Sequence, residues 1–261
     1  MVSAVLSQNR RRLLGRLRMR RQREREGAVL VEGVRAVSEA LDAGAAPSFA
    51  VVSPRLSGSR SGQGLLEELE RRVEVVKVTD AEMEEIGATD QPQGVVMVCR
   101  QPTPELEALP SSGRLVVLDA VQDPGNVGTL IRSAVAFALD GVVCLDGTVD
   151  PWGAKVVRAS AGAAFRIPIW SAGIGEALDA LTAREASVLV ASAEGRRPSE
   201  VMSGRDGLSA LVLGNEGAGV RGEVRSIAHG TVAIPMPGAV DSLNVGVAGS
   251  ILMYEWVRCG T

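Results

Sequence analysis

The sequence has 261 residues, of which 46% are hydrophobic, and its formal net charge is −3. A chain of this length and composition can bury a real core and has room for one large or two ordinary domains. No apolar run approaches the roughly 20 residues that a membrane-spanning helix needs, so we expect a soluble globular protein without a membrane segment.

Cysteine and histidine are too few for several kinds of site. The three cysteines, Cys99, Cys144 and Cys259, are far apart and odd in number, which argues against a disulfide framework and a zinc site. The single histidine, His229, excludes a histidine dyad, and we expect it on the surface. A reducing compartment, the cytoplasm, is therefore predicted.

Residues 1 to 25 form a strongly basic segment with nine arginines and one glutamate, a net charge of +8, so the rest of the chain carries −11. The pattern predicts one helix over residues 3 to 25, with Leu6, Leu13 and Leu17 on a single stripe. Three interpretations stay open: contact with the phosphates of a nucleic acid, a charged helix docked on its own domain, or an arginine-rich organellar presequence.

From residue 28 onward short strands and helices alternate, which is typical of a small α/β domain with helices covering a sheet. Residues 53 to 64 are rich in Ser and Gly and are expected to be a mobile, exposed loop. Residues 102 to 113 contain three prolines and end in Ser-Ser-Gly, so we expect a linker there. The chain is thus divided into a first domain over residues 1 to 101 and a second over residues 114 to 261.

Apolar strands alternate with helices through the second domain, which predicts a parallel sheet covered on both faces. The strands are expected over residues 115–121, 141–145, 166–170, 187–193, 210–215 and 231–235, with helices starting near residues 126, 155, 174 and 220. A loop is expected over residues 194 to 209. Ligands of such sheets bind at the carboxyl ends of the strands. Three loops at such ends are rich in Gly, Asn, Glu and Ser, namely residues 119–132, 213–221 and 235–244.

The segment over residues 234 to 255 contains a sharp loop and then the last helix. Two prolines and a glycine end the preceding strand, and the helix is expected to start at Ser242 or Asn244. The residues that follow are apolar on every face, so the helix is expected to be buried. Gly246 and Gly249 each cost about 1 kcal/mol relative to alanine inside a helix, which indicates close approach of another backbone.

Two of the three loops contain distinctive motifs. The first reads DAVQDPGNVGTLIR from Asp119 to Arg132, where Pro-Gly-Asn turns into a helix whose N-terminal amides could hold an anion. Read by itself, Asn126 is a helix cap and Arg132 a surface charge. The second reads LGNEGAGV from Leu213, and its glycines would let a ligand approach the backbone closely. It is not a dinucleotide fingerprint, because it lies late in the domain with Glu216 at its centre.

Together with DSLN at residues 241 to 244 and KVVRASAG at residues 155 to 162, these motifs resemble the SpoU/TrmH group of SPOUT methyltransferases over residues 115 to 258. That group transfers a methyl group from S-adenosylmethionine to a ribose 2'-hydroxyl in RNA. Upstream, residues 23 to 27 and residues 90 to 94 look like parts of the ribosomal-protein-like RNA-binding domain that many rRNA-modifying members have.

The resemblance implies a parallel sheet whose C-terminal segment forms a deep trefoil knot, and a homodimer whose active sites are completed across the interface. S-adenosylmethionine would lie in the knot, against Leu213, Gly214, Gly217, Ile234, Met236 and Leu243. The catalytic side chains that it implies are Asn126, Arg132, Glu216, Ser242 and Asn244. The chain departs from the family at Phe137-Ala138, where many members have Phe-Gly, and this could tilt the following turn.

We therefore expect methylation of a ribose in RNA, with ribosomal RNA as the substrate. The alternatives are tRNA ribose or RNA base methylation on the same fold, a catalytically silent RNA-binding module, and an unrelated nucleotide-binding enzyme. Arg132 has two candidate roles, activation of the 2'-hydroxyl or a grip on the adjacent phosphate. A guanidinium is essentially always protonated in proteins, which favours the second role. No metal is expected, because the sulfonium is already activated.

Overall fold

The computed structural model of the protein describes residues 6–89, 91–202, 207–238 and 242–259. The chain forms two compact units. The first comprises Met1–Pro102 with Trp152–Arg166, and the second comprises Thr103–Pro151 with Ile167–Thr261. The first unit thus includes a stretch that the sequence placed in the second domain. The roles assigned to the two predicted domains stay predictions.

A four-stranded sheet forms the centre of the first unit. β4 (Val95–Arg100) is antiparallel to both β1 (Ala28–Glu32) and β2 (Pro47–Val52), and β3 (Val75–Lys77) pairs with β2 in parallel. These strands are rich in valine, and β4 is buried along Val95 to Cys99. The predicted small α/β domain is confirmed.

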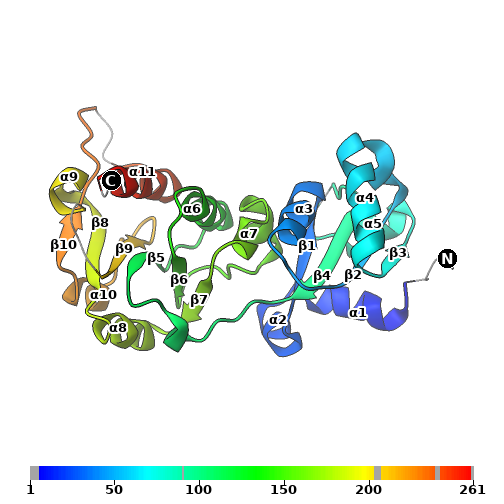
Figure 1. Ribbon diagram of the computed structural model, residues 1–261, viewed down its shortest axis with the longest axis horizontal. Helices are drawn as coiled ribbons and strands as arrows, with labels where there is room; N and C mark the ends of the chain where they lie inside the picture. Colours follow the sequence, from blue (N-terminus) through cyan, green and yellow to red (C-terminus); the bar gives the residue numbers. More distant parts are fainter. Residues whose placement is uncertain (1–5, 90, 203–206, 239–241, 260–261) are drawn as a thin grey trace. The chain divides into compact units, whose positions relative to one another are not determined.

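Helices cover both faces of this sheet. Figure 1 shows α3 (Val34–Asp42) and α4 (Arg60–Arg72) on one side of it and α1 (Gln8–Arg16) on the other. Leu14 and Leu17 at α1 pack with Met83 and Ile86 at α5 (Asp80–Ile86) over the strands. From the later stretch, α7 (Ala154–Ala159) contacts β1, and the 3-10 helix η3 (Ala163–Phe165) contacts α3.

The basic segment forms two helices where the sequence predicted one. α1 ends at Arg16, and α2 (Arg20–Glu26) starts after a break at residues 17–19; residues 3–5 of the predicted helix lie outside the described part. Several arginines of this segment hold carboxylates of their own unit. Arg10 pairs with Glu74 at 2.5 Å, and Arg11 pairs with Glu82 at 2.9 Å. This is the arrangement expected of a charged helix docked on its own domain.

Two predicted loops are partly helix or strand. Residues 53–64 contain the 3-10 helix η1 (Pro54–Gly58) and the start of α4, where the Ser59 hydroxyl accepts a hydrogen bond from the Gly62 amide at 3.1 Å. Leu56 is buried there and holds the segment against the core. The high content of Ser and Gly did not indicate this contact. Of residues 194–209, the first three extend β8 and four more form α9 (Pro198–Val201), while residues 203–206 lie outside the described part.

The proline-rich residues 102–113 are mostly packed on the second unit. They contain the 3-10 helix η2 (Leu106–Ala108), followed by the buried Leu109. The Arg184 guanidinium donates to the carbonyl oxygens of Leu109 at 3.1 Å and Glu107 at 2.9 Å. The side chain of Trp170 donates to the carbonyl of Glu105 at 3.0 Å.

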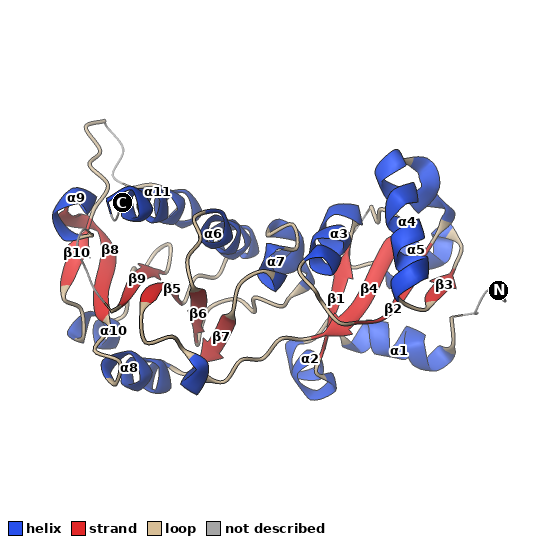
Figure 2. Ribbon diagram, in the orientation of Figure 1, coloured by secondary structure: helices blue, strands red, loops and turns tan. Residues whose placement is uncertain are grey.

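The second unit is built on a sheet of six strands, all parallel, in the order β10-β8-β9-β5-β6-β7 (Figure 2). Its strands are β5 (Gly113–Asp119), β6 (Gly141–Leu145), β7 (Ile169–Ala172), β8 (Ser187–Arg196), β9 (Leu208–Gly214) and β10 (Gly230–Val232). Figure 1 shows α6 (Pro124–Ala136) and α11 (Val245–Cys259) on one face, and α8 (Ile174–Thr182) and α10 (Gly222–Ser226) on the other. The predicted parallel sheet with helices on both faces is confirmed. No helix within the described ranges is long and apolar enough to cross a bilayer.

The glycines of α11 allow close packing, as predicted, although mainly against side chains. An added Cβ at Gly249 would lie 2.3 Å from Leu130 Cδ2 and 2.5 Å from Leu213 Cδ1. At Gly246 it would lie 3.4 Å from the Cα atom of Asn126. α11 therefore lies directly on α6 and β9. The predicted knot depends on the path of residues 239–241, which lie outside the described part, and it stays a prediction.

Ala138, where many SpoU/TrmH members have glycine, has φ of +52° and is left-handed. This conformation costs a non-glycine residue about 1 to 2 kcal/mol. The turn between α6 and β6 thus has the geometry that suits glycine, and the alanine makes it strained.

Candidate active site

Residues of β8, the loops after β9 and β10 and the start of α11 surround a cavity of about 480 Å³. All six residues predicted to bind the cofactor line it: Leu213, Gly214, Gly217, Ile234, Met236 and Leu243. The sequence did not indicate Ala191, Ser192 and Ala193 within β8, or Asn215, Gly219 and Arg225. The sequence gives no signal for the three residues of β8, because that strand looks like any other apolar strand.

Asn126 and Glu216, 90 residues apart, meet at this end of the sheet. The Asn126 Nδ2 atom donates to Glu216 Oε1 at 2.9 Å, and the backbone amides of Gln122 and Asp123 point at the same carboxylate at 3.4 Å. Burial raises the pKa of Glu216, but the hydrogen bonds from Asn126 and from the backbone amides outweigh it, so the pKa lies below its ordinary value. Glu216 is therefore an anion that fixes the amide of Asn126.

Asn126 does not cap α6. The cap is Asp123, whose Oδ1 atom accepts a hydrogen bond from the Asn126 amide at 2.8 Å. Because Asp123 satisfies this backbone group, the Asn126 side chain is available for Glu216. Asn126 is also 8% exposed, which does not suit a solvent-facing cap.

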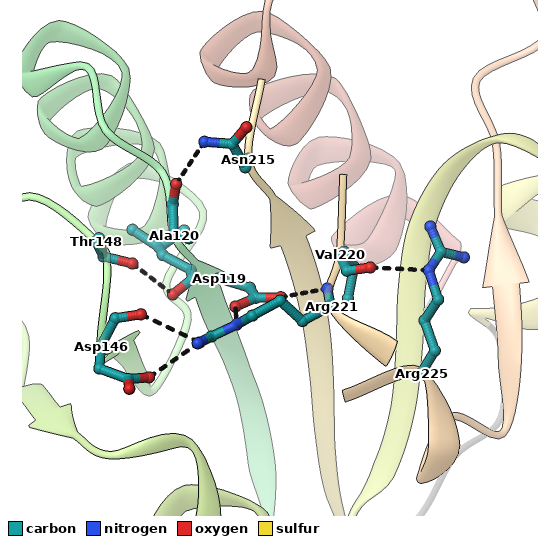
Figure 3. A network of polar contacts seen from close by, with 9 residues as sticks. Asp119, Ala120, Asp146, Thr148, Asn215, Val220, Arg221 and Arg225 are labelled. Atoms are coloured by element: carbon teal, nitrogen blue, oxygen red, sulfur yellow. Dashed lines mark hydrogen bonds and ion pairs between the residues drawn. The ribbon is translucent and has the colours of Figure 1, made fainter. Parts of the chain in front are cut away.

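A network of ion pairs holds the glycine-rich loop after β9 at the end of β5 (Figure 3). Asp119 is fully buried, and its carboxylate accepts from the Arg221 backbone amide at 2.7 Å and from Arg221 Nε at 2.6 Å. The Arg221 guanidinium also donates to the Asp146 carboxylate at 3.0 Å. Burial lowers the pKa of Arg221, but the hydrogen bonds to Asp146 and Asp119 raise it by more. The ends of β5, β6 and β9 are therefore tied together.

Asn215 adds a second tie. Its Nδ2 atom donates to the carbonyl of Ala120 at 2.9 Å (Figure 3). Its Oδ1 atom accepts from the amides of Gly217 and Ala218 at 2.9 Å. The loop that holds Glu216 is thus shaped by its own asparagine and anchored to the chain after β5.

The other three predicted catalytic residues lie in different surroundings. Ser242 and Asn244 line the cavity, and Asn244 caps α11 by accepting from the amides of Gly246 at 2.9 Å and Val247 at 3.2 Å. Arg132 is exposed on α6 and does not line the cavity. The chain therefore brings Asn126, Glu216, Ser242 and Asn244 to one region and leaves Arg132 facing solvent.

Nothing in the described ranges resembles a metal site, since no group of three or more His, Cys, Asp or Glu side chains could hold an ion there. His229 is exposed, as predicted, and its Nδ1 atom accepts from the Val188 amide at 3.1 Å.

The family model described as "SpoU rRNA Methylase family" matches residues 113–254, which is more than half of the chain. The chain belongs to the SpoU rRNA methylase family. A second model, the MRM3-like substrate binding domain, matches residues 9–97 of this SpoU methylase. It therefore includes α2 and all but the first residue of α1 in the basic segment.

Two curated rRNA methyltransferases are similar to this chain over 92% of its length. The 23S rRNA (guanosine(2553)-2'-O)-methyltransferase RlmP of Bacillus subtilis is 31% identical over 240 residues, which is 92% of each protein. The 23S rRNA (uridine(2479)-2'-O)-methyltransferase of Streptomyces viridochromogenes is 32% identical and covers 92% of this chain and 85% of its own. Among solved structures, the SpoU methyltransferase AviRb from S. viridochromogenes in complex with AdoMet matches with a TM-score of 0.84 and 28% identity, over 97% of this chain and 98% of that one.

Proposed function

We propose that this SpoU methylase transfers a methyl group from S-adenosylmethionine to a ribose 2'-hydroxyl of ribosomal RNA. The observation that supports this most directly is the cavity beside β8, β9 and β10, whose lining includes Glu216, the hydrogen-bond partner of Asn126. The named relatives are 23S rRNA 2'-O-methyltransferases. The first unit, through its match to a substrate-binding domain, would hold the RNA.

The cavity suits the cofactor in size and in chemistry. Its volume of about 480 Å³ falls in the range of roughly 300 to 1,000 Å³ that is typical of small-molecule sites. Leu213, Ile234 and Leu252 give it apolar walls for a purine ring, and backbone groups near Gly214 and Gly217 can come close to a ligand. S-adenosylmethionine would supply an activated methyl group there.

The protein would contribute mainly position and charge. Glu216 fixes Asn126, which leaves the Asn126 carbonyl oxygen free to orient the ribose or an arginine. Arg132 would grip the phosphate beside the target ribose and stabilise the charge that develops on the 2'-oxygen. A guanidinium stays protonated in proteins, so the proton of the hydroxyl would pass to the phosphate or to water. Ser242 and Asn244 would order the loop around both substrates.

A homodimer would explain why Arg132 lies away from the cavity of its own chain. Val247, Ile251 and Tyr254 are between 36% and 50% exposed on α11 and lie one turn apart along one face of the helix. Tyr254 also packs on Phe137, with 5.8 Å between ring centroids, so this apolar surface continues to the end of α6. We infer that a second copy covers it and that Arg132 acts in the cavity of the partner. The proposed compartment is the cytoplasm.

The test is to map 2'-O-methyl groups in the ribosomal RNA of the source cells with and without this gene. We expect one ribose to lose its methyl group when the gene is removed and to regain it when the gene is restored. Nucleoside digestion of RNA methylated in vitro separates ribose from base products. An unchanged methylation map, or a label that stays on a base, would contradict the proposal.

A further inference from the structure

A second cavity, of about 180 Å³, lies in the first unit and is lined by residues at the start of α3, by Thr89, Gln91 and Gln93, and by residues at the end of α7. It is lined by two arginines from distant parts of the sequence, Arg35 on α3 and Arg158 on α7. The amide side chains of Gln91 and Gln93 also line it. Arg158 belongs to the KVVRASAG motif, which the proposed mechanism leaves without a role.

The side-chain acceptors of Glu32 and Gln93 in this cavity already receive hydrogen bonds from the protein. Glu32 is the one carboxylate among its described lining residues, and its oxygens already accept from the Ala88 amide at 2.6 Å and from the Thr89 hydroxyl. The Oε1 atom of Gln93 accepts from the Val34 amide at 2.9 Å, which leaves the Gln93 NH₂ group. Among the described residues, Arg35 and Arg158 have no carboxylate within ion-pair distance.

Other arginines of the first unit are used differently. Arg10, Arg11, Arg55, Arg72 and Arg166 each pair with a glutamate of the same unit. Arg35 and Arg158 are exposed and face one cavity. Two guanidinium groups and the Gln93 NH₂ group around one small space are complementary to an anion.

Close packing joins the end of α7, which has Arg158, to α3, which has Arg35. Gly162, just after α7, has φ of +85°, and a Cβ there would lie 2.7 Å from the carbonyl oxygen of Ala36 on α3. Arg166 forms an ion pair with Glu39, which is also on α3. The turn that follows α7 therefore lies directly on α3. This packing places Arg35 and Arg158 at the same cavity.

We propose that this cavity binds a backbone phosphate of the substrate RNA. Its volume is below the roughly 300 Å³ at which small-molecule pockets begin, so it has room for a phosphate group rather than for a nucleotide. Paired arginines bind the oxygens of a phosphodiester through several N–H donors, and such contacts position a nucleic acid without reading its sequence. The inference rests on the proposed function for the identity of the RNA, but not for the anion that the cavity binds.

The experiment measures binding of purified large-subunit ribosomal RNA by the full chain at several salt concentrations, for Arg35→Gln and Arg158→Gln. Each variant is expected to bind about tenfold more weakly, as for loss of a hydrogen bond to a charged group. The plot of the logarithm of the association constant against the logarithm of the salt concentration has a negative slope. Each variant is expected to reduce the magnitude of this slope by about 1, the value for one lost phosphate contact. S-adenosylhomocysteine binding, measured by calorimetry, should not change.

The matched control is Arg71→Gln. Arg71 is exposed on α4, outside both the basic segment and the lining of this cavity, and the substitution removes the same charge from the same unit. This variant is expected to bind RNA as the wild type does. An equal loss in all three variants, or no loss in Arg35→Gln and Arg158→Gln, would overturn the phosphate site.

Failure of the proposed function gives a different result. In that case the wild-type chain transfers no methyl group to a ribose of this RNA, whatever the binding data show. A wild-type chain that methylates normally, with both arginine variants unchanged in affinity and salt slope, would contradict the phosphate site alone.

Discussion

The side chain of Glu216 is exposed, and its carboxylate accepts three hydrogen bonds. Its side chain lies at the rim of the cavity, yet it receives the Asn126 amide at 2.9 Å and two backbone amides at 3.4 Å. Donors of this kind stabilise the carboxylate form of a glutamate and not its protonated form. The loop after β9 and the chain before α6 are therefore joined by an interaction that depends on charge.

This interaction makes stability depend on pH in a defined direction. Because the pKa of Glu216 is lowered in the folded protein, its stabilisation is complete above the unfolded value of roughly 4.3 and is lost as pH falls through the lower folded value. The Glu216→Gln variant has no carboxylate at this position and so lacks this pH-dependent stabilisation. The wild type should exceed the variant in unfolding free energy by a constant amount between about pH 5 and 7, and the difference should shrink below about pH 4. Urea unfolding at each pH measures it, and a difference that stays constant down to pH 3 would contradict the assignment.

At the residue scale the sequence predicted the members of the site better than their contacts. The motif resemblance named Asn126 and Glu216, and the structure joins them. The resemblance gave no role to Asp119 and did not name Arg221, although these two residues hold the glycine-rich loop after β9 in place. The reason is that they are 102 residues apart, and their contact exists only because β5 and β9 are neighbours in the sheet. A single sequence shows which strands exist but not their order.

At the scale of elements, α11 packs closely on α6 and β9. Gly249 lies where a Cβ would be 2.3 Å from Leu130 and 2.5 Å from Leu213, closer than nonbonded carbon atoms approach. Even alanine would therefore force the two leucines or the helix to move.

We expect Gly249→Ala to lower the free energy of unfolding by about 1 to 3 kcal/mol, the usual cost of overpacking. The control is Gly175→Ala in α8 of the same unit, where no atom lies within 4 Å of the added Cβ. That change should be neutral or stabilise by up to about 1 kcal/mol, because alanine favours a helix. Chemical denaturation of both variants gives the comparison, and a Gly249→Ala protein as stable as Gly175→Ala would refute the packing argument.

Elements were predicted well where hydrophobic pattern determined them and less well where packing did. The strand expected over residues 141–145 agrees with β6, and the helix expected to start near residue 174 agrees with α8. The basic helix was predicted as one because arginine favours helix throughout, whereas the structure interrupts it at residues 17–19, with Leu17 buried. Residues 53–64 were taken for a loop because Ser and Gly are frequent there, and the single buried Leu56 was outweighed.

At the scale of the whole molecule, the exposed face of α11 and the position of Arg132 lead to one prediction. If Arg132 acts in the partner's cavity, an Arg132→Ala chain and a Gly217→Trp chain should each be inactive alone. Gly217 lines the cavity and its nearest neighbour to an added Cβ is Asn215 at 3.6 Å, so tryptophan there should fill the cavity without disturbing the loop. Mixed and allowed to exchange subunits, the two chains should recover about one quarter of wild-type activity, because half of the dimers are mixed and each has one complete site.

A control for this mixing experiment is the same pair of chains with Val247→Asp in both. A charge in the apolar face of α11 should prevent association, so the mixture should stay inactive and light scattering should report monomers. Recovery in the presence of Val247→Asp would show that this face is not the interface. No recovery without it would place Arg132 in the cavity of its own chain.

The discontinuous make-up of the first unit bears on the order in which the protein folds during synthesis. Residues Met1–Pro102 leave the ribosome first, but α7 and η3, which complete this unit, follow only after Thr103–Pro151 has been made. Until then Ala36 and Glu39 on α3 lack the glycine and the arginine that cover them in the finished protein. Domains that are continuous in sequence can fold as soon as they emerge. Here the N-terminal unit waits for the middle of the chain, so a fragment cut at Pro102 would be an unfinished unit.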